Sequence, residues 1–156
     1  MAERSHRYPV NVTWTGNRGS GTSSYRAYGR EHEITAGSKP PIPGSSDPAF
    51  RGDPGRWNPE EMLVSTLSTC HMLWYLHLAA EAGVVVVGYA DAAEGLMAEH
   101  PVSGGAFTGV TLRPRVTISA GDPAVAVHLH HEAHAKCFIA NSVNFPVGCE
   151  AEIIGP

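Results

Sequence analysis

The chain has 156 residues and a formal net charge of −4, with 42% hydrophobic and 17% charged residues. This length and composition predict one soluble globular domain, and the negative charge argues against a nucleic-acid partner. The longest apolar run is shorter than the roughly 20 residues of a membrane span, and the first residues, MAERSHRYPV, lack the apolar core of a secretion signal, so we expect a cytoplasmic protein.

The N-terminal part predicts a β-hairpin over residues 8–34. YPVNVTWT alternates and is rich in β-forming residues, YRAYGREHEI provides the partner strand, and the glycine-rich GNRGSGTSS provides the turn. Residues 37–57 are dense in Pro, Gly, Ser and Asp, which predicts a long loop. Loops of this length tend to be functional or to wrap a partner.

Residues 59–82 carry the strongest local signal, that of a long helix. Asn58 suits the N-cap, Glu60 and Glu61 favour the positive end of the helix dipole, and Glu61 completes a capping box. Gly83 fits the C-terminal cap. Apolar residues occupy nearly every side of this segment, which predicts a central, buried helix. Leu63, Leu67, Cys70, Trp74 and His77 share one stripe of this helix, with further apolar residues on its flanks.

The second half predicts strands within residues 84–121, a helix over 123–136 and a final strand over 144–154. The segments 84–99 and 105–121 are rich in β-forming residues, and the Asp-Pro pair at 122–123 starts the helix. Strands and helices in this order predict the α+β class.

Three cysteines are candidates for chemistry: Cys70, Cys137 and Cys149. A thiol is nucleophilic only as the thiolate, and burial in an apolar helix disfavours that form. Because buried free cysteines often only pack, an inert core role and a reactive role both stay open for Cys70 and Cys137. Cys149 lies in a predicted strand without an evident partner, so we expect a structural role there.

The histidines of HLHHEAH (residues 128–134) suggest a metal site only weakly. His130 and His134 are spaced for one face of a helix, but the four histidines of this segment point around most of its circumference. The zinc-protease pattern HExxH is one residue longer than HEAH. We therefore expect structural roles and no metal here, with a histidine-bound metal protein as an alternative.

Three motifs resemble the OsmC/Ohr family of osmotically induced and organic-hydroperoxide-resistance proteins. NPEEMLVSTLSTC is similar to the family pattern of NPEx, an apolar run and Cys. AHAKCFIANS resembles AHxxCPYSNA, which aligns His134, Cys137 and Asn141, and TGNRGSG matches a glycine-flanked arginine turn. The motifs occur in the family's order and span about the whole chain, residues 1–156.

The resemblance implies antiparallel sheets around a long central helix in an intertwined homodimer. It implies a cytoplasmic antioxidant enzyme of the stress response that reduces organic hydroperoxides, with hydrogen peroxide as a further substrate. This chemistry needs no metal or organic cofactor. Carried over by position, Cys70 is the peroxidatic cysteine, Cys137 the resolving one, Arg18 the cation that stabilises the thiolate and Glu60 its carboxylate partner. An external dithiol then reduces the disulfide, and Leu67, Trp74, Phe138 and Ile139 are candidates for an apolar substrate wall.

The sequence also departs from the family pattern. CPYS becomes CFIA after Cys137, and His71 replaces the aromatic residue that often follows the first cysteine. Ten residues of helix separate Glu60 from Cys70 by about 15 Å along the axis, so we favour Glu60 serving the partner subunit's site. A non-enzymatic dimer that holds an apolar ligand in its interface cavity is the main alternative function.

Overall fold

The computed structural model describes residues 3–155, so residues 1–2 and 156 of the expected domain lie outside the described residues. The chain forms two compact units that divide between Met62 and Leu63. The first unit holds one small sheet. The second unit holds the other two sheets, all of the second α-helix and most of the first.

The first unit contains an antiparallel sheet in the order β1-β2-β3. Its elements are β1 (Asn11–Trp14), β2 (His32–Thr35), β3 (Ile42–Gly44) and the short 3-10 helix η1 (Pro48–Phe50). The second strand of the hairpin begins later than predicted, because the residues that pair with β1 begin at His32. The residues between the two strands form a longer turn. The expected loop 37–57 is also wrong in part, since it contains β3 and η1. Pro43 is tolerated in β3 because this strand lies at the sheet edge.

Helix α1 (Pro59–Glu81) begins and ends where local chemistry places it. The Glu61 N–H donates to Asn58 Oδ1 at 2.8 Å, and the Asn58 N–H donates to Glu61 Oε2 at 3.4 Å, which is the predicted capping box. Gly83 has a φ of 73°, the left-handed conformation that favours glycine after a helix.

The two predicted long strands of the second unit are each split in two. The four observed strands are β4 (Val85–Asp91), β5 (Glu94–Ala98), β6 (Ala106–Leu112) and β7 (Pro114–Ala120). β4 pairs with β7 and β5 with β6, so the hairpin passes from one sheet to another at the breaks. A hydrogen bond connects the chain at these two breaks: the N–H of Arg113, between β6 and β7, donates to Oδ1 of Asp91, at the end of β4, at 2.6 Å.

The last part of the chain contradicts the expectation of wholly antiparallel sheets. Helix α2 (Pro123–Lys136) and the 3-10 helix η2 (Ala140–Ser142) precede β8 (Val147–Cys149) and β9 (Glu152–Ile154). β8 pairs in parallel with β6, and β9 pairs in parallel with β7, which makes both sheets mixed. The physical reason is that α2 carries the chain back across the sheet, as parallel pairing requires.

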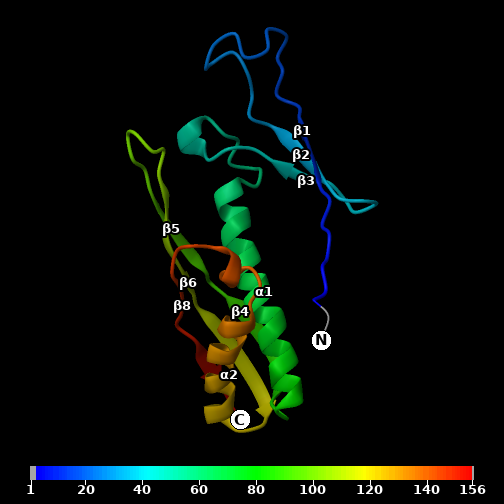
Figure 1. Cartoon of the computed structure of the whole chain (residues 1–156), viewed down its shortest axis with the longest axis vertical. Coiled ribbons are helices and arrows are strands. Elements are labelled where there is room, and N and C mark those ends of the chain that lie inside the picture. The colour runs from blue at the N-terminus through cyan, green and yellow to red at the C-terminus, as the bar shows by residue number, and fades with distance from the viewer. Residues whose placement is uncertain (1–2, 156) are drawn as a thin grey trace. The chain divides into compact units, whose positions relative to one another are not determined.

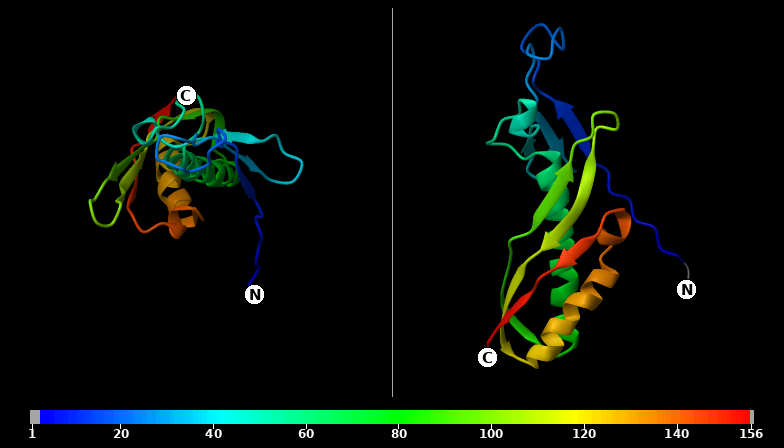
Figure 2. Two further views of the ribbon diagram at one scale, coloured as in Figure 1. Left: turned by 90° about the horizontal axis from the view of Figure 1, so that it is seen from above. Right: turned by 90° about the vertical axis from the view of Figure 1, so that its left-hand side faces the viewer.

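The main core of the second unit lies between α1, α2 and the sheet β4-β7-β9 (Figures 1 and 2). Its buried hydrophobic members are Tyr75, Leu78, Ala79, Val84, Val116, Ile118, Ala126, Leu129 and Ala133. The Tyr75 hydroxyl joins the helices by donating to the Ala126 carbonyl at 3.0 Å. The buried face of α1 contains Leu67, His71, Tyr75, Leu78 and Ala79. Of the stripe named from the sequence, Leu67 lies on this buried face.

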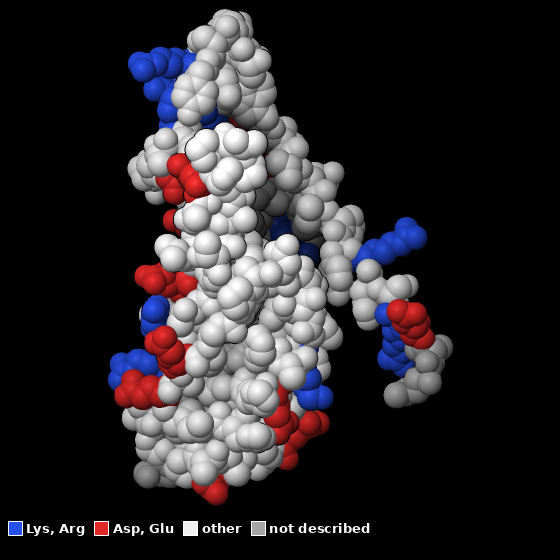
Figure 3. Space-filling model, turned by 60° about the vertical axis from the view of Figure 1, so that its left-hand side comes forward, with Lys and Arg blue, Asp and Glu red and all other residues white. Residues whose placement is uncertain are grey.

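Charged side chains of both signs are interspersed on the face shown in Figure 3. Arg113 pairs with Glu150 at 3.4 Å, and Arg115 pairs with Glu152 at 2.8 Å, so acidic partners accompany these basic groups. Among the described residues, every helix is too short or too polar to cross a membrane.

Candidate functional site

The structure brings Cys70 and Cys137 together within the second unit. Cys70 is half-buried on α1, and Cys137 is buried at the C-cap of α2; both are free thiols. Burial raises the pKa of the Cys137 thiol, and the hydrogen bond and charge of the neighbouring Cys70 raise it further. Two neighbouring thiols have a short path to a disulfide. The catalytic roles of both residues stay predictions.

The turn after Cys137 fixes the position of this thiol. The Ala140 N–H donates to Cys137 Sγ at 3.4 Å, and the Asn141 N–H donates to the Cys137 carbonyl at 3.0 Å. The Asn141 side chain also donates to the Ala135 carbonyl at 3.2 Å, which ties the turn to the end of α2. The segment therefore forms a hydrogen-bonded turn although it lacks the proline of the family pattern.

A pocket of about 510 Å³ opens beside Cys70. It is lined by Thr66, Thr69, Cys70, Leu73, Trp74, His77, Phe138 and Ile139. Trp74 and Phe138 meet edge to face with 5.5 Å between ring centroids, which joins α1 to the segment after α2. Of the four expected wall residues, Leu67 does not line this pocket, because it is buried in a separate core cluster with Val110 and Leu112.

Arg18 and Glu60 both lie in the first unit. Arg18 Nη2 lies 3.7 Å from Glu31 Oε1, and the Arg18 side chain is 60% exposed. Its turn is held by Asn17 Oδ1, which accepts from two glycine N–H groups. Glu60 Oε2 is buried and has no hydrogen-bond partner among the described residues. The predicted pairing of Arg18 with Glu60 is therefore not among the ion pairs that the structure gives for the described residues.

Lys136 is a cation that the sequence analysis did not single out. Its Nζ lies 5.7 Å from the centroid of the Trp74 ring, which lines the pocket beside Cys70. Lys136 is the last residue of α2 and immediately precedes Cys137. It therefore brings positive charge to this pocket from within the second unit.

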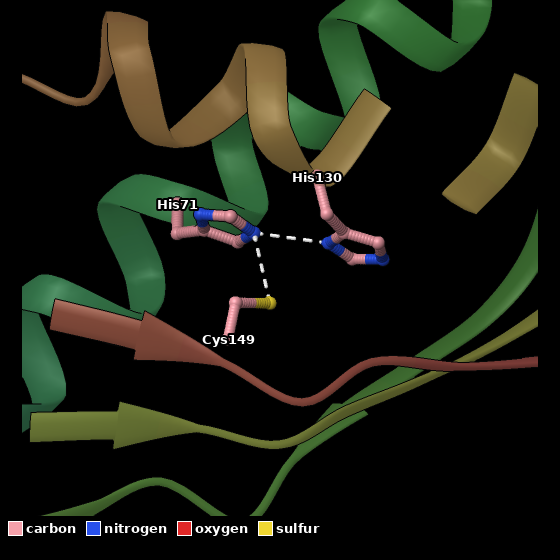
Figure 4. A group of neighbouring side chains, drawn as sticks. All are labelled: His71, His130 and Cys149. Carbon is pink, nitrogen blue, oxygen red and sulfur yellow. Dashed lines mark hydrogen bonds between the residues drawn. The ribbon is translucent and has the colours of Figure 1, made fainter. Parts of the chain in front are cut away.

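A second cluster joins His71, His130 and Cys149, which come from α1, α2 and β8 (Figure 4). His71 Nε2 lies 3.0 Å from His130 Nδ1 and 4.0 Å from Cys149 Sγ. Cys149 thus has a histidine neighbour that the sequence did not indicate. Burial lowers the pKa of His71 and lowers that of His130 to about 4, and burial raises the pKa of Cys149 to about 11.

The histidines of the 128–134 segment differ in burial because they lie on different sides of α2. Of the four in the 128–134 segment, only His130 is buried. His128 is exposed and lies 3.4 Å from Glu132. Sequence spacing could not reveal the cluster, because His71 is 59 residues from His130 and 78 from Cys149. The one signal was the unusual histidine that follows Cys70.

Comparisons with known proteins agree on one family. The model described as OsmC-like protein matches residues 52–152. An OsmC-like protein of unknown function from Vibrio cholerae has 31% identity and a TM-score of 0.85, with 94% of this chain and 99% of that chain covered. A search of curated proteins found no match.

Two more distant structures share the fold. An organic hydroperoxide resistance protein OsmC from Legionella pneumophila has 17% identity and a TM-score of 0.69, with 98% of this chain and 100% of that chain covered. A putative organic hydroperoxide resistance protein from Vibrio cholerae, with captopril bound in one active site, has 20% identity and a TM-score of 0.68, with 99% and 97% covered.

Proposed function

Because the chain belongs to the OsmC-like family, we propose that it is a thiol-dependent peroxidase that reduces organic hydroperoxides. The observation that carries this proposal is that Cys70 lines an apolar pocket and lies close enough to Cys137 to raise the pKa of its thiol. The family includes organic hydroperoxide resistance proteins, and relatives with that description share the fold.

The two thiols differ in a way that assigns their roles in the proposal. Cys70 lines the pocket, whereas Cys137 is 1% exposed and does not line it, so a peroxide meets Cys70 first. The Cys70 thiolate attacks the distal oxygen, the O–O bond breaks, and the alcohol leaves with a proton, which yields a sulfenic acid. The Cys137 sulfur then attacks this sulfenic acid, water leaves, and a disulfide forms. An external dithiol reduces the disulfide by exchange.

The pocket supports an organic substrate. Its wall consists mainly of apolar side chains, among them Leu73, Trp74, Phe138 and Ile139. An alkyl or aryl group gains about 25 cal/mol for each Å² of apolar surface that it removes from water. Hydrogen peroxide has no such group, so the pocket should favour organic hydroperoxides.

The peroxidase requires a cation that stabilises the Cys70 thiolate, and two arginine or lysine candidates are available. Arg18 is the predicted one, with Glu60 as its carboxylate partner in the same or the other subunit. The buried and unpartnered Glu60 Oε2 supports this role, because a buried carboxylate oxygen requires a donor. Lys136 is the second candidate, because its ammonium lies near the Trp74 ring.

The proposal includes a homodimer, as the resemblance implies. Large apolar side chains are exposed near the N-terminus: Tyr8 and Val10 before β1, and Val12 and Trp14 on it. Because alternate residues of a strand share one face, Val12 and Trp14 lie on the same side of β1, where a second copy would cover them. Sedimentation velocity tests this part, and a monomer at micromolar concentrations would contradict it.

The direct test is intact-mass measurement before and after one equivalent of cumene hydroperoxide. The expected result is loss of two hydrogen atoms, mapped by proteolysis to a link between Cys70 and Cys137, with release of cumyl alcohol. Dithiothreitol should restore the original mass. Unreactive native thiols together with saturable binding of cumyl alcohol would instead favour the alternative, a non-enzymatic module whose apolar pocket holds a ligand.

Substitution of the two candidate cations tells which one serves the thiolate. Arg18→Met and Lys136→Met each keep a long apolar side chain and remove one charge. If Arg18 is the stabilising group, Arg18→Met lowers the rate constant for Cys70 oxidation about 10- to 100-fold, because an opposite charge shifts a thiol pKa by one to two units. Lys136→Met then has a small effect. Stopped-flow measurement of peroxide consumption decides, and the reverse pattern transfers the role to Lys136.

A further inference from the structure

We propose that His71, His130 and Cys149 form a second, separate site that binds one Zn²⁺ ion. The atoms that these side chains offer all lie within 4.8 Å of one another. Figure 4 shows both imidazoles and the sulfur pointing toward a common point. Imidazole nitrogen and thiolate sulfur are the ligands that zinc prefers in proteins.

The separations fit tetrahedral coordination. Zn–N bonds of about 2.0–2.1 Å and a Zn–S bond of about 2.3 Å place two nitrogens about 3.4 Å apart and a nitrogen about 3.6 Å from sulfur. The observed separations are 3.0 Å between His71 Nε2 and His130 Nδ1, and 4.0 Å between His71 Nε2 and Cys149 Sγ. The third separation, between the His130 ligand atom and Cys149 Sγ, is no more than 4.8 Å, so shifts of up to about 1 Å bring all three atoms to the distances of zinc coordination.

The environment of the two rings supports this assignment. His71 and His130 are 1% and 4% exposed, and their remaining nitrogens, His71 Nδ1 and His130 Nε2, are buried without hydrogen-bond partners among the described residues. Among the described residues, the only hydrogen-bond partners of these rings are therefore each other and the Cys149 thiol. Burial of two imidazoles with so few polar partners is costly, and an ion gives them a common partner.

A route for the ion is also present. A pocket of about 540 Å³ is lined by His130, His134 and Cys149 among other residues. His134 lies one turn beyond His130 on α2 and lines the same pocket, but its ligand atoms are not in the group of three, so the fourth position is open to water. Binding displaces the proton of the Cys149 thiol.

The site would hold together the elements that carry the two other thiols. His71 follows Cys70 on α1, and Cys149 is the last residue of β8. His130 lies on α2 about two turns before Cys137, the C-cap of this helix. A bound ion would therefore fix α1 against α2 and β8. This inference does not depend on the proposed function, because it uses neither Cys70 nor Cys137.

The experiment uses a parent chain with Cys70→Ser and Cys137→Ser, which leaves Cys149 as the only thiol. The parent is titrated with Zn²⁺ against a chromophoric chelator and with Co²⁺, whose thiolate complex has a near-ultraviolet charge-transfer band. We expect one ion per chain, a thiolate-to-cobalt band, and a rise in the thermal midpoint on adding Zn²⁺. Cys149→Ser should abolish the band and weaken Zn²⁺ binding at least about 10- to 100-fold.

Matched controls separate this site from surface histidines. His130→Gln removes a buried ligand, whereas His128→Gln removes an exposed histidine from the same helix and should leave Zn²⁺ affinity unchanged. Because His130→Gln risks misfolding, the exposed residue Cys149 provides the decisive variant. Zn²⁺ affinity that survives Cys149→Ser, or that falls with His128→Gln instead, would overturn the proposal.

Discussion

The Cys70→Ser protein should consume organic hydroperoxide no faster than buffer does. Cys70 lines the pocket and contacts the second thiol, so its sulfur is the atom that a bound peroxide reaches. A serine hydroxyl is not ionised at neutral pH and cannot accept the distal oxygen, so the turnover rate should fall by about three orders of magnitude or more. The measurement is cumene hydroperoxide consumption in the presence of excess dithiothreitol.

A matched substitution tests whether the loss is specific to this thiol. Cys149→Ser removes a sulfur that lies outside the pocket, and both variants are assayed with a chelator so that metal ions play no part. We expect Cys149→Ser to consume peroxide at a rate close to that of the unmodified chain. Activity that survives Cys70→Ser but disappears in Cys149→Ser would show that the peroxidatic thiol lies in the second cluster.

The helices were predictable from the sequence because their ends are determined by neighbouring residues. The Asn58–Glu61 capping box and the left-handed Gly83 mark the limits of α1, and Asp122 accepts from the Ala124 N–H at 2.8 Å at the start of α2. Each signal lies within a few residues of the boundary that it sets. Local chemistry of this kind survives in any tertiary context.

Strand pairing was less accessible because it depends on residues far apart in the chain. The sequence predicts that the 84–121 region is extended, but neither the breaks near Asp91 and Arg113 nor the parallel register of β8 with β6 follows from alternation alone. A similar limit applies to the face of α1. With apolar residues on nearly every side, the helix has no periodic signal that distinguishes the core face.

The candidate site shows the same division between local and distant information. Cys70 and Cys137 were singled out through motifs, and the structure adds that their side chains interact. The second cluster had no motif, because its three members come from three elements and have no regular spacing. The buried position of His71 was also unexpected, because a polar residue on an apolar helix gives no indication of whether it faces solvent or a partner.

The Cys137→Ser protein should complete one turnover with cumene hydroperoxide and then stop with Cys70 as a sulfenic acid. Cys137 is buried beside Cys70 and held by the Ala140 N–H, so no other described thiol is placed to condense with the oxidised sulfur. A serine hydroxyl cannot form the disulfide that dithiol reductants recognise. Release of one equivalent of cumyl alcohol, followed by dimedone labelling of Cys70, is the expected result.

Excess peroxide should then show whether Cys137 protects Cys70 from over-oxidation or only packs beside it. In the unmodified chain the disulfide shields Cys70, whereas in Cys137→Ser the exposed sulfenic acid should proceed to the sulfinic acid, which dithiothreitol does not reduce. Intact mass after increasing equivalents of peroxide follows this step, with Ala140→Gly as a control that keeps the thiol and its backbone donor. Normal cycling of Cys137→Ser with a dithiol would mean that reductant reaches the Cys70 sulfenic acid directly and that Cys137 only packs against it.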